Sequence, residues 1–415
     1  MSIIFHITTR VLTQNKIEPK GPPENALSQK RIDKLKPLCH TVVSSKKQIT
    51  AMSPCKKTLS FISDILEQLK SFIYYSQDGN LGDLLIAEAT RQLFSTLNVQ
   101  YTLYNEGNLP EKYAMVHSGG GRFIPYWCNI DEAIEQLCNE HITRCVILPS
   151  SFKDVDRLLE HFDERHILFC RDSYSYEYCK SICSKSEVYC ADDMALCLRL
   201  INLRPVPTCD AEGYCVTDDE VSTLQAIRNG VFKHLHNGIL RASEKVRIDG
   251  KEKSVAFLFR TDKEKGTTYD SGASFDASIV WHTTGSNIMF NGNMLRQFSH
   301  ALKQVDVVVS DRLHVCVMAY LSGREVYMLD NNYGKVRGVY ELSLANKPMI
   351  HLLADGKLPP DLEAAWQRLT TEHARREART QSLRYKAWVG TLVILGKCKR
   401  FLKRPLQSII NAVRK

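Results

Sequence analysis

Short apolar runs that alternate with amphipathic helical patterns constrain this chain more than any other feature of its sequence. The first six predicted strands are Ser71–Tyr75, Tyr101–Tyr104, Tyr113–His117, Cys145–Leu148, His166–Cys170 and Glu187–Cys190. The helical patterns around them are Leu59–Phe72, Asp83–Leu97, Ile130–Glu140 and Tyr174–Ser181. Strands and helices that alternate in this way predict a parallel sheet with helices on both faces.

A second series of the same kind follows a proline-containing interruption at Leu203–Cys215. Its predicted strands are Ser254–Phe259, Ser278–Trp281, Val305–Ser310 and Glu325–Leu329, with a helix at Leu313–Ser322. We therefore predict an α/β protein with two doubly wound, Rossmann-like domains that face a cleft, where ligands bind beyond the carboxyl ends of the strands. The predicted boundaries are a disordered basic extension 1–57, a first domain 58–205, a linker 206–222, a second domain 223–358 and a basic helical tail 359–415.

The charge of the chain is concentrated at its two ends. Residues 1–57 and 361–415 have net charges of +8 and +9, which leaves −8 for residues 58–360. A nucleic-acid-binding surface needs basic residues on the folded body to neutralise phosphates. This distribution therefore disfavours a nucleic-acid partner.

The 14 cysteines do not form a pattern typical of a metal site. They are scattered without any C-x-x-C pair, so we predict no metal. The first residues lack the basic and apolar regions of a secretory signal, which favours a reducing cytoplasm and free thiols. No run of about 20 apolar residues predicts a membrane-spanning helix.

Two glycine-containing segments are candidates for ligand contact. In the first, Asn80 and Asp83 lie between a predicted strand and a predicted helix, so Asp83 either faces the cleft or only caps the helix. The second contains Gly119, Gly120 and Gly121 directly after the strand that ends at His117. Three glycines permit close approach of a sugar or a phosphate, and the alternative is a flexible loop.

Three arginines share one placement, because each follows the carboxyl end of an apolar strand. They are Arg171, Arg260 and Arg312. Together they would suit a small, highly anionic ligand, since a guanidinium binds carboxylate and phosphate in bidentate fashion. The alternative for each is a structural ion pair with a neighbouring acid, which is Asp172, Asp262 or Asp311.

His314 is predicted in the first turn of a helix, where the macrodipole and free N–H groups favour an anion. A histidine there can act as a proton donor, and the alternative is a histidine that caps the helix and packs between layers. Lys335 follows the next strand and offers a cation from a turn, or is an exposed loop lysine.

These segments occur in an order that resembles the polysaccharide pyruvyl transferases, most closely the exopolysaccharide pyruvyl transferases of bacteria. The motifs are Gly79-Asn-x-Gly-Asp83, the Gly119–Gly121 loop, Arg171-Asp172, Asp192-Asp-Met-Ala195, Arg260-x-Asp262, Ser310-Asp-Arg-Leu-His314 and Asp330-Asn-Asn-Tyr-Gly-Lys335. The resemblance covers residues 70–340. One departure is Leu148-Pro-Ser-Ser151, where the family usually has Pro-Gln-Ser, so a side-chain amide contact is expected to be missing.

The resemblance implies the architecture of GT-B glycosyltransferases and transfer of pyruvate from phosphoenolpyruvate to a sugar as a ketal, with no cofactor. It gives Arg171, Arg260, Arg312 and Lys335 as candidate donor-binding residues. Protonation of the vinyl carbon needs a general acid, for which we choose His314, and Asp83 is the candidate that takes the proton of the sugar hydroxyl. The cleft loops on the acceptor side are Asn80 and Gly119–Gly121.

The C-terminal tail suggests a second partner. The charged helical pattern Asp361–Arg384 could return to the first domain, as final helices do in that architecture. Beyond it, the apolar segment Trp388–Leu395 lies among basic residues, a combination that can lie on an anionic leaflet. The alternative is a tail that packs on its own body or on a partner.

We therefore predict a cytoplasmic enzyme, peripheral on the inner face of the plasma membrane, that pyruvylates a lipid-linked saccharide during exopolysaccharide synthesis. A glycosyltransferase that uses a nucleotide-sugar is the first alternative. A saccharide-binding protein without catalysis is the second, and it would tolerate the loss of His314.

Overall fold

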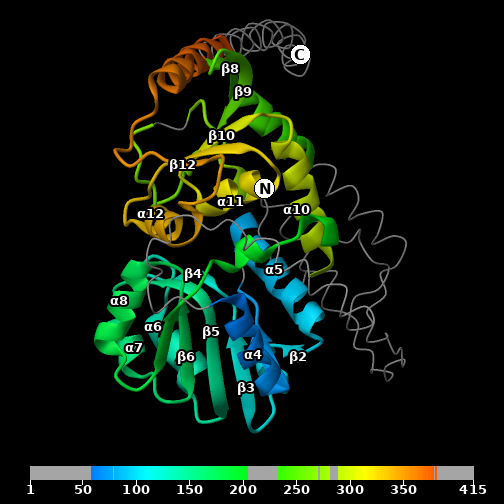
Figure 1. Cartoon of the computed structure of the whole chain (residues 1–415), viewed down its shortest axis with the longest axis vertical. Helices are drawn as coiled ribbons and strands as arrows, with labels where there is room; N and C mark the ends of the chain where they lie inside the picture. Colours follow the sequence, from blue (N-terminus) through cyan, green and yellow to red (C-terminus); the bar gives the residue numbers. More distant parts are fainter. Residues whose placement is uncertain are drawn as a thin grey trace, which may run out of the picture. The chain divides into compact units, whose positions relative to one another are not determined.

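The computed structural model describes residues 58–77, 79–203, 232–269, 272–280, 288–377 and 379–380. These residues belong to one compact unit with two β-sheets (Figure 1). The predicted extension 1–57, the linker 206–222 and the tail segment Trp388–Leu395 lie outside the described residues. No helix of the described part is long and apolar enough to cross a membrane.

The first sheet is parallel throughout. Its strands follow the order β2-β1-β3-β5-β6-β7, and β4 pairs with β5 outside this path. The strands are β1 (Ser71–Tyr75), β2 (Gln100–Leu103), β3 (Tyr113–His117), β4 (Gly120–Phe123), β5 (Ile142–Phe152), β6 (His166–Cys170) and β7 (Glu187–Cys190). The helices are α4 (Leu59–Leu69), α5 (Leu81–Leu97), α6 (Ile130–Cys138), α7 (Asp156–Glu160) and α8 (Ser173–Ile182). The strand order reverses between β1 and β3, so the chain segments that leave these two strands flank the position where such sheets bind ligands.

The second sheet has the order β12-β11-β10-β9-β8, with only the β8–β9 pair antiparallel. Its strands are β8 (Ser243–Ile248), β9 (Lys251–Phe257), β10 (Val307–Ser310), β11 (Glu325–Met328) and β12 (Ile350–Leu352). The helices are α10 (Ile288–Leu302), α11 (Leu313–Leu321) and α12 (Lys335–Val339), together with helical residues 232–241 and 360–377.

Among the described strands the second sheet has no reversal of order, so the winding in two directions that we predicted for both domains is found in the first sheet alone. Successive right-handed crossovers that all move in one direction place their helices on one face of a sheet. Side chains of α10, α11 and α12 accordingly pack in one hydrophobic cluster, and helix 360–377 packs in a separate cluster on the other face.

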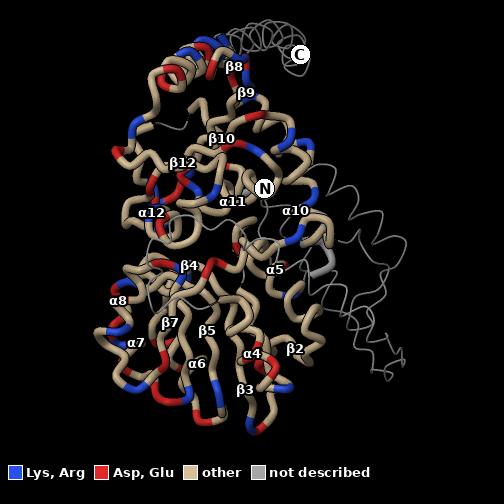
Figure 2. Tube along the Cα trace, viewed as in Figure 1, with Lys and Arg blue, Asp and Glu red and all other residues tan. Residues whose placement is uncertain are grey.

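Helix 360–377 carries charged residues of both signs along its length (Figure 2). Its apolar side packs on the second sheet, where the Trp366 ring lies 5.4 Å from that of Phe257 and 5.3 Å from that of Phe259. The described part of the predicted tail helix therefore packs on the second sheet and does not return to the first.

Helix α5 connects the two sheets through the largest hydrophobic cluster. This cluster contains Leu84 and Phe94 of α5, Phe169 of the first sheet and Val308 of the second. The first turns of α5 and α11 meet there, since a Cβ on Gly82 would overlap the ring of His314. Only a residue without a side chain at position 82 allows this close approach.

Four strands of the structure have the predicted bounds: Ser71–Tyr75, Tyr113–His117, His166–Cys170 and Glu187–Cys190. The predicted strand at Ser278–Trp281 is wrong, because Ala277–Val280 forms the short 3₁₀ helix η4 and Trp281 is not described. The Ser278 hydroxyl donates to Asp276 (3.1 Å), which also accepts from the Thr261 backbone (2.9 Å). This side-chain pairing fixes a local turn where apolar alternation predicts a strand.

Candidate functional site

A cavity of about 560 Å³ is lined by residues that follow the strands of both sheets. Eight of the predicted site residues line it: Asn80, Asp83, Gly121, Arg171, Arg260, Arg312, His314 and Lys335. The other lining residues are Tyr75, Gln77, Gly79, Arg122, Trp127, Asp262, Glu264, Ser278, Leu313 and Val315. The fold brings these eight residues to one cavity because the carboxyl ends of parallel strands converge.

The first turn of α5 supplies Asn80 and Asp83. The Asn80 side chain accepts from the Gly82 backbone (2.7 Å), and the Asp83 carboxylate accepts from the Asn80 backbone (2.9 Å). This reciprocal pair is a capping box, so Asp83 does cap the helix. The same carboxyl also lines the cavity, and burial raises its pKa against the opposing effect of His314. Both readings of Asp83 are therefore compatible with its position.

The three glycines lie in and before β4, and each has a different surrounding. A Cβ on Gly119 would lie 2.5 Å from the Pro149 carbonyl oxygen, and Gly120 has a φ of +137°. A Cβ on Gly121 would lie 3.2 Å from Nη2 of Arg171 and 3.7 Å from Nζ of Lys335. The absence of a side chain at Gly121 thus leaves room for two cations at the cavity wall.

Arg171 lies fully buried at the end of β6 and is held by two side chains. Its Nη1 donates to Asp193 (2.7 Å), and its Nε donates to Ser151 (2.9 Å). The ion pair is thus with Asp193 and not with the neighbouring Asp172, which capping of α8 already occupies. Ser150, which stands in the position of the expected glutamine, donates to the Leu148 carbonyl (2.8 Å) and does not line the cavity.

His314 lies at the start of α11 beside this buried pair. Its Nε2 is 3.4 Å from Oδ2 of Asp193 and 3.5 Å from Nη1 of Arg171. Burial would raise the pKa of Asp193, but the charge of Arg171 and the contact with His314 hold it well below its usual range. Asp193 is therefore an ionised carboxylate in contact with the imidazole of His314. The histidine therefore does more than pack between layers.

Asp193 is a site residue that the sequence analysis did not single out. It follows β7 within the motif Asp192-Asp-Met-Ala195, and this position after a strand is the sequence feature that could have identified it. Its carboxylate also accepts from the Ala195 backbone (2.8 Å), which fixes it in place.

Arg260 and Arg312 share the carboxylate of Asp262. Arg260 Nε donates to one oxygen (2.9 Å) and Arg312 Nη2 donates to the other (2.8 Å). Arg312 also pairs with Asp276 (2.6 Å) and not with Asp311, the alternative for this arginine, whereas Arg260 does pair with Asp262. One carboxylate oxygen of Asp311 instead accepts from the Arg260 backbone (2.8 Å).

Lys335 begins α12 and its side chain is only 11% exposed, so it is not the exposed loop lysine of the alternative. Its Nζ lies 2.6 Å from Glu264, whose same oxygen is 2.8 Å from Nη1 of Arg260. Burial lowers the pKa of Lys335 to about 8, with the cations of Arg260 and Arg171 adding to this and Glu264 opposing it.

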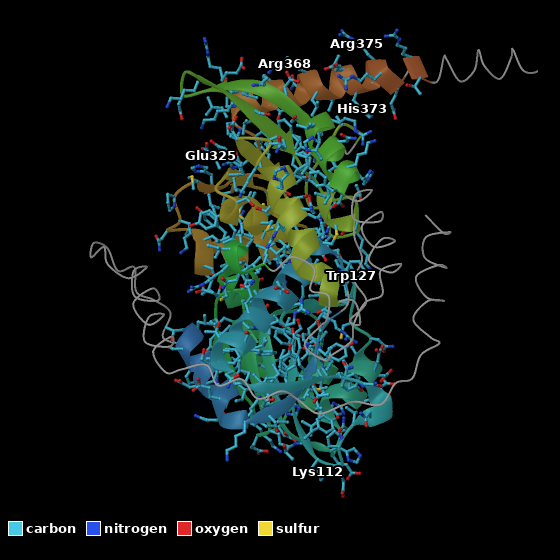
Figure 3. The ribbon with its side chains drawn as sticks, turned by 90° about the vertical axis from the view of Figure 1, so that its right-hand side faces the viewer. Lys112, Trp127, Glu325, Arg368, His373 and Arg375 are labelled. Carbon is cyan, nitrogen blue, oxygen red and sulfur yellow. The ribbon has the colours of Figure 1, made fainter. Side chains whose placement is uncertain are left out.

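Glu264, Arg122 and Trp127 were also missed by the sequence analysis. Trp127, labelled in Figure 3, follows β4, and its indole N–H donates to Glu264 (2.6 Å). The sequence offers a signal for Arg122, which directly follows the three glycines. Glu264 and Trp127, by contrast, are 137 positions apart. Nothing local in the sequence indicates such a pairing.

The described residues contain no cluster of three or more His, Cys, Asp or Glu side chains that could hold a metal ion. The site is instead built from ion pairs: five Arg or Lys and three Asp or Glu side chains line the cavity. This excess of cations suits a small ligand with more than one negative charge.

The fold and the site define an α/β protein with two Rossmann-like sheets and a cationic ligand cavity between strand ends. The profile of the polysaccharide pyruvyl transferase family matches residues 80–333, which is more than half of the chain and includes most of the cavity. The chain belongs to the polysaccharide pyruvyl transferase family.

The chain is also similar to one protein in sequence and to another in fold. The chain is 24% identical over 336 residues to EpsO of Bacillus subtilis (strain 168), provisionally named a pyruvyl transferase, with 76% of this chain and 98% of that protein covered. The fold is similar to that in the crystal structure of a functionally uncharacterized protein, KP1_0663, from Klebsiella pneumoniae subsp. pneumoniae NTUH-K2044. That similarity has a TM-score of 0.53 and 23% identity, over 73% of this chain and all of the other.

Proposed function

We propose that this protein transfers pyruvate from phosphoenolpyruvate to a saccharide and forms a ketal. The observation that carries the proposal is the convergence of His314, Asp83 and the excess of cations on one cavity. The family assignment supports the class of reaction, and the residues of the cavity support the choice of donor.

Phosphoenolpyruvate has a phosphate and a carboxylate on one small carbon frame. Arg260, Arg312 and Lys335 come from the second sheet and offer guanidinium and ammonium groups to these anions. Each of them is already paired with a carboxylate of the protein, and this pairing offsets part of the positive charge at the cavity. The donor would share or replace these partners when it binds.

The reaction needs one proton donor and one proton acceptor. His314 would protonate the vinyl carbon, which turns C2 into an oxocarbenium-like centre that a sugar hydroxyl attacks. Loss of phosphate restores such a centre, and a second hydroxyl closes the ketal ring. Of the two hydroxyl protons, one replaces the proton given to carbon and the other leaves with phosphate. Asp83, which lines the cavity and whose pKa burial raises, would accept a hydroxyl proton.

Asp193 is the residue that would orient His314 in this scheme. Its Oδ2 lies 3.4 Å from Nε2 of the imidazole, and buried Arg171 holds Asp193 in place and keeps its pKa low. A protein that only bound saccharide would have no need for a histidine held against a buried ion pair. A nucleotide-sugar glycosyltransferase would need a site for base and ribose.

We further propose that the acceptor is lipid-linked, that the pathway is bacterial exopolysaccharide synthesis and that the enzyme acts in the cytoplasm on the inner face of the plasma membrane. The support is the basic tail: six basic side chains between Lys386 and Arg404 surround an apolar segment. Each is worth about 1 kcal/mol near an anionic surface.

A thermal-shift screen tests the donor assignment. Phosphoenolpyruvate should raise the melting temperature, whereas UDP-glucose, UDP-galactose and GDP-mannose should not. Stabilisation by a sugar nucleotide, with no effect of phosphoenolpyruvate, would replace this proposal with the glycosyltransferase alternative.

A further inference from the structure

The cavity lining divides by chemistry as well as by sheet. On one side, Tyr75, Gln77, Arg122 and Trp127 all follow or belong to strands of the first sheet, and we call these four residues the first-sheet wall. The residues that follow the strands of the second sheet are mainly charged and joined in ion pairs.

Gln77 carries a polar atom that nothing in the described part of the chain satisfies. Its side-chain oxygen Oε1 is buried and has no hydrogen-bond partner among the described residues. A Cβ on Gly120 would lie 3.3 Å from this oxygen, so the amide is closely packed at the cavity wall. Phosphoenolpyruvate in its ionised form offers only acceptors, and a carbonyl oxygen needs a donor. A sugar hydroxyl is such a donor.

Trp127 presents an aromatic ring that is both fixed and accessible. The residue is 48% exposed, yet its indole N–H donates to Glu264 (2.6 Å) and Nζ of Lys263 lies 4.5 Å from the ring centroid. These two contacts fix the orientation of the ring. A ligand that packs on it therefore costs little additional side-chain entropy. A flat apolar surface of this kind suits the C–H face of a pyranose and not a small dianion.

Arg122 and Tyr75 complete the wall with oriented polar groups. Nη1 of Arg122 donates to the Tyr75 hydroxyl (2.5 Å), and the guanidinium lies 5.2 Å from the centroid of the Tyr75 ring. Nη2 of Arg122 is 3.3 Å from Glu132, a largely exposed partner. A fixed aromatic ring beside planar polar side chains is a surface for polyhydroxylated ligands, which need both apolar contact and directed hydrogen bonds.

We infer that the first-sheet wall is the acceptor subsite, where Trp127 packs on a pyranose ring and Gln77 accepts a hydrogen bond from one of its hydroxyls. This inference rests on the proposed function, since it assigns the acceptor of that reaction. Asp83 and His314 lie at the helix starts that meet in the same cavity, so a saccharide on this wall has its hydroxyls beside the residues that move protons.

Saturation-transfer NMR with the full chain tests the subsite directly. The probes are the methyl β-pyranosides of glucose, galactose and mannose, titrated in the presence of phosphoenolpyruvate. Trp127→Ala should weaken binding of the best probe by about tenfold or more, and Gln77→Met should weaken it by about threefold to tenfold. Trp127→Phe should remain within about threefold, because it keeps a ring at the same position.

Tyr174→Ala is the matched control, since Tyr174 is an aromatic residue of α8 that is 56% exposed and does not line the cavity. It should bind the probes as the wild type does. Calorimetry of phosphoenolpyruvate should give unchanged affinity for Gln77→Met and Tyr174→Ala, which also shows that these variants are folded. In Trp127→Ala any loss of phosphoenolpyruvate affinity should be smaller than the loss of probe binding, because Glu264 keeps its pairs with Lys335 and Arg260.

Three results would overturn the inference: wild-type affinity for the probes in both Trp127→Ala and Gln77→Met, equal losses of probe and phosphoenolpyruvate binding, or no probe binding by the wild type. If probes bind and respond to these substitutions while phosphoenolpyruvate does not bind at all, the subsite stands and the proposed function fails.

Discussion

Raising the pH through the pKa of Lys335 should weaken phosphoenolpyruvate binding. Burial lowers this pKa to about 8, so the ammonium group loses its charge well below the usual range of a lysine. An anion bound at Nζ favours the charged form, and binding therefore takes up a proton above pH 8. Affinity should be flat up to that pH and then fall by up to about tenfold per unit. The total loss of affinity is limited to the contribution of one charge-assisted hydrogen bond, which is about 1.5–3 kcal/mol.

The stability of the free protein should change in the opposite direction over the same range. The pKa of Lys335 is lower in the folded state than its ordinary value of 10.5, so between pH 8 and pH 10.5 the unfolded chain binds more protons. The contribution of this group to the free energy of unfolding then rises with pH, by about 3 kcal/mol in total. Weaker binding above pH 8 would thus not come from loss of the fold.

Calorimetry from pH 7 to pH 9.5, in two buffers of different ionisation enthalpy, measures both the affinity and the number of protons taken up. In Lys335→Arg the side chain stays charged, so the decline and the proton uptake above pH 8 should disappear. Lys180→Arg on the exposed side of α8 is the control and should behave as the wild type. A wild-type affinity that is constant to pH 9.5, or a decline that persists in Lys335→Arg, would refute the reasoning.

Four further predictions follow from the same geometry. His314→Gln should keep phosphoenolpyruvate affinity and lose about 10²–10⁴ in turnover, and a loss below about tenfold would exclude it as the acid. Arg260→Lys and Arg312→Lys should each weaken phosphoenolpyruvate binding in calorimetry, because a point charge cannot replace a bidentate fork; wild-type affinity in both contradicts this. Asp193→Asn leaves the buried Arg171 unpaired and should cost about 3–5 kcal/mol in urea unfolding, and a change below about 0.5 kcal/mol would show that the pair is not structural. A 1–384 truncation should lose co-sedimentation with anionic vesicles but keep activity on a soluble acceptor, and high salt should weaken the co-sedimentation of the full chain. Equal sedimentation of the two proteins would exclude the tail as an anchor.

Sequence patterns predict the parts of this molecule that depend on local order along the chain. Arg171 and Arg312 lie at the cavity because each comes within two residues of the end of a buried strand, and such ends converge at one edge of a parallel sheet. The helix start that holds Asp83 is equally local, since its cap is complete within four residues.

The rest depends on which distant segments meet. His314 and Arg171 are 143 positions apart, and the carboxylate between them, Asp193, comes from a third segment. Periodicity gives the face that a strand buries but not its neighbour in the sheet, so the one-directional order of the second sheet could not be predicted. The pairing of Trp127 with Glu264 is of the same kind.

The central claim is that this cavity protonates phosphoenolpyruvate at carbon and joins C2 to a saccharide. The most direct measurement is NMR of the full chain with phosphoenolpyruvate and a saccharide acceptor in D₂O, following the phosphorus and methyl signals together. The account predicts one inorganic phosphate released for each ketal formed, with one deuterium in the new methyl group, and loss of both signals in His314→Gln. Unchanged phosphoenolpyruvate with no ketal formed, or phosphate released without a ketal, would contradict it.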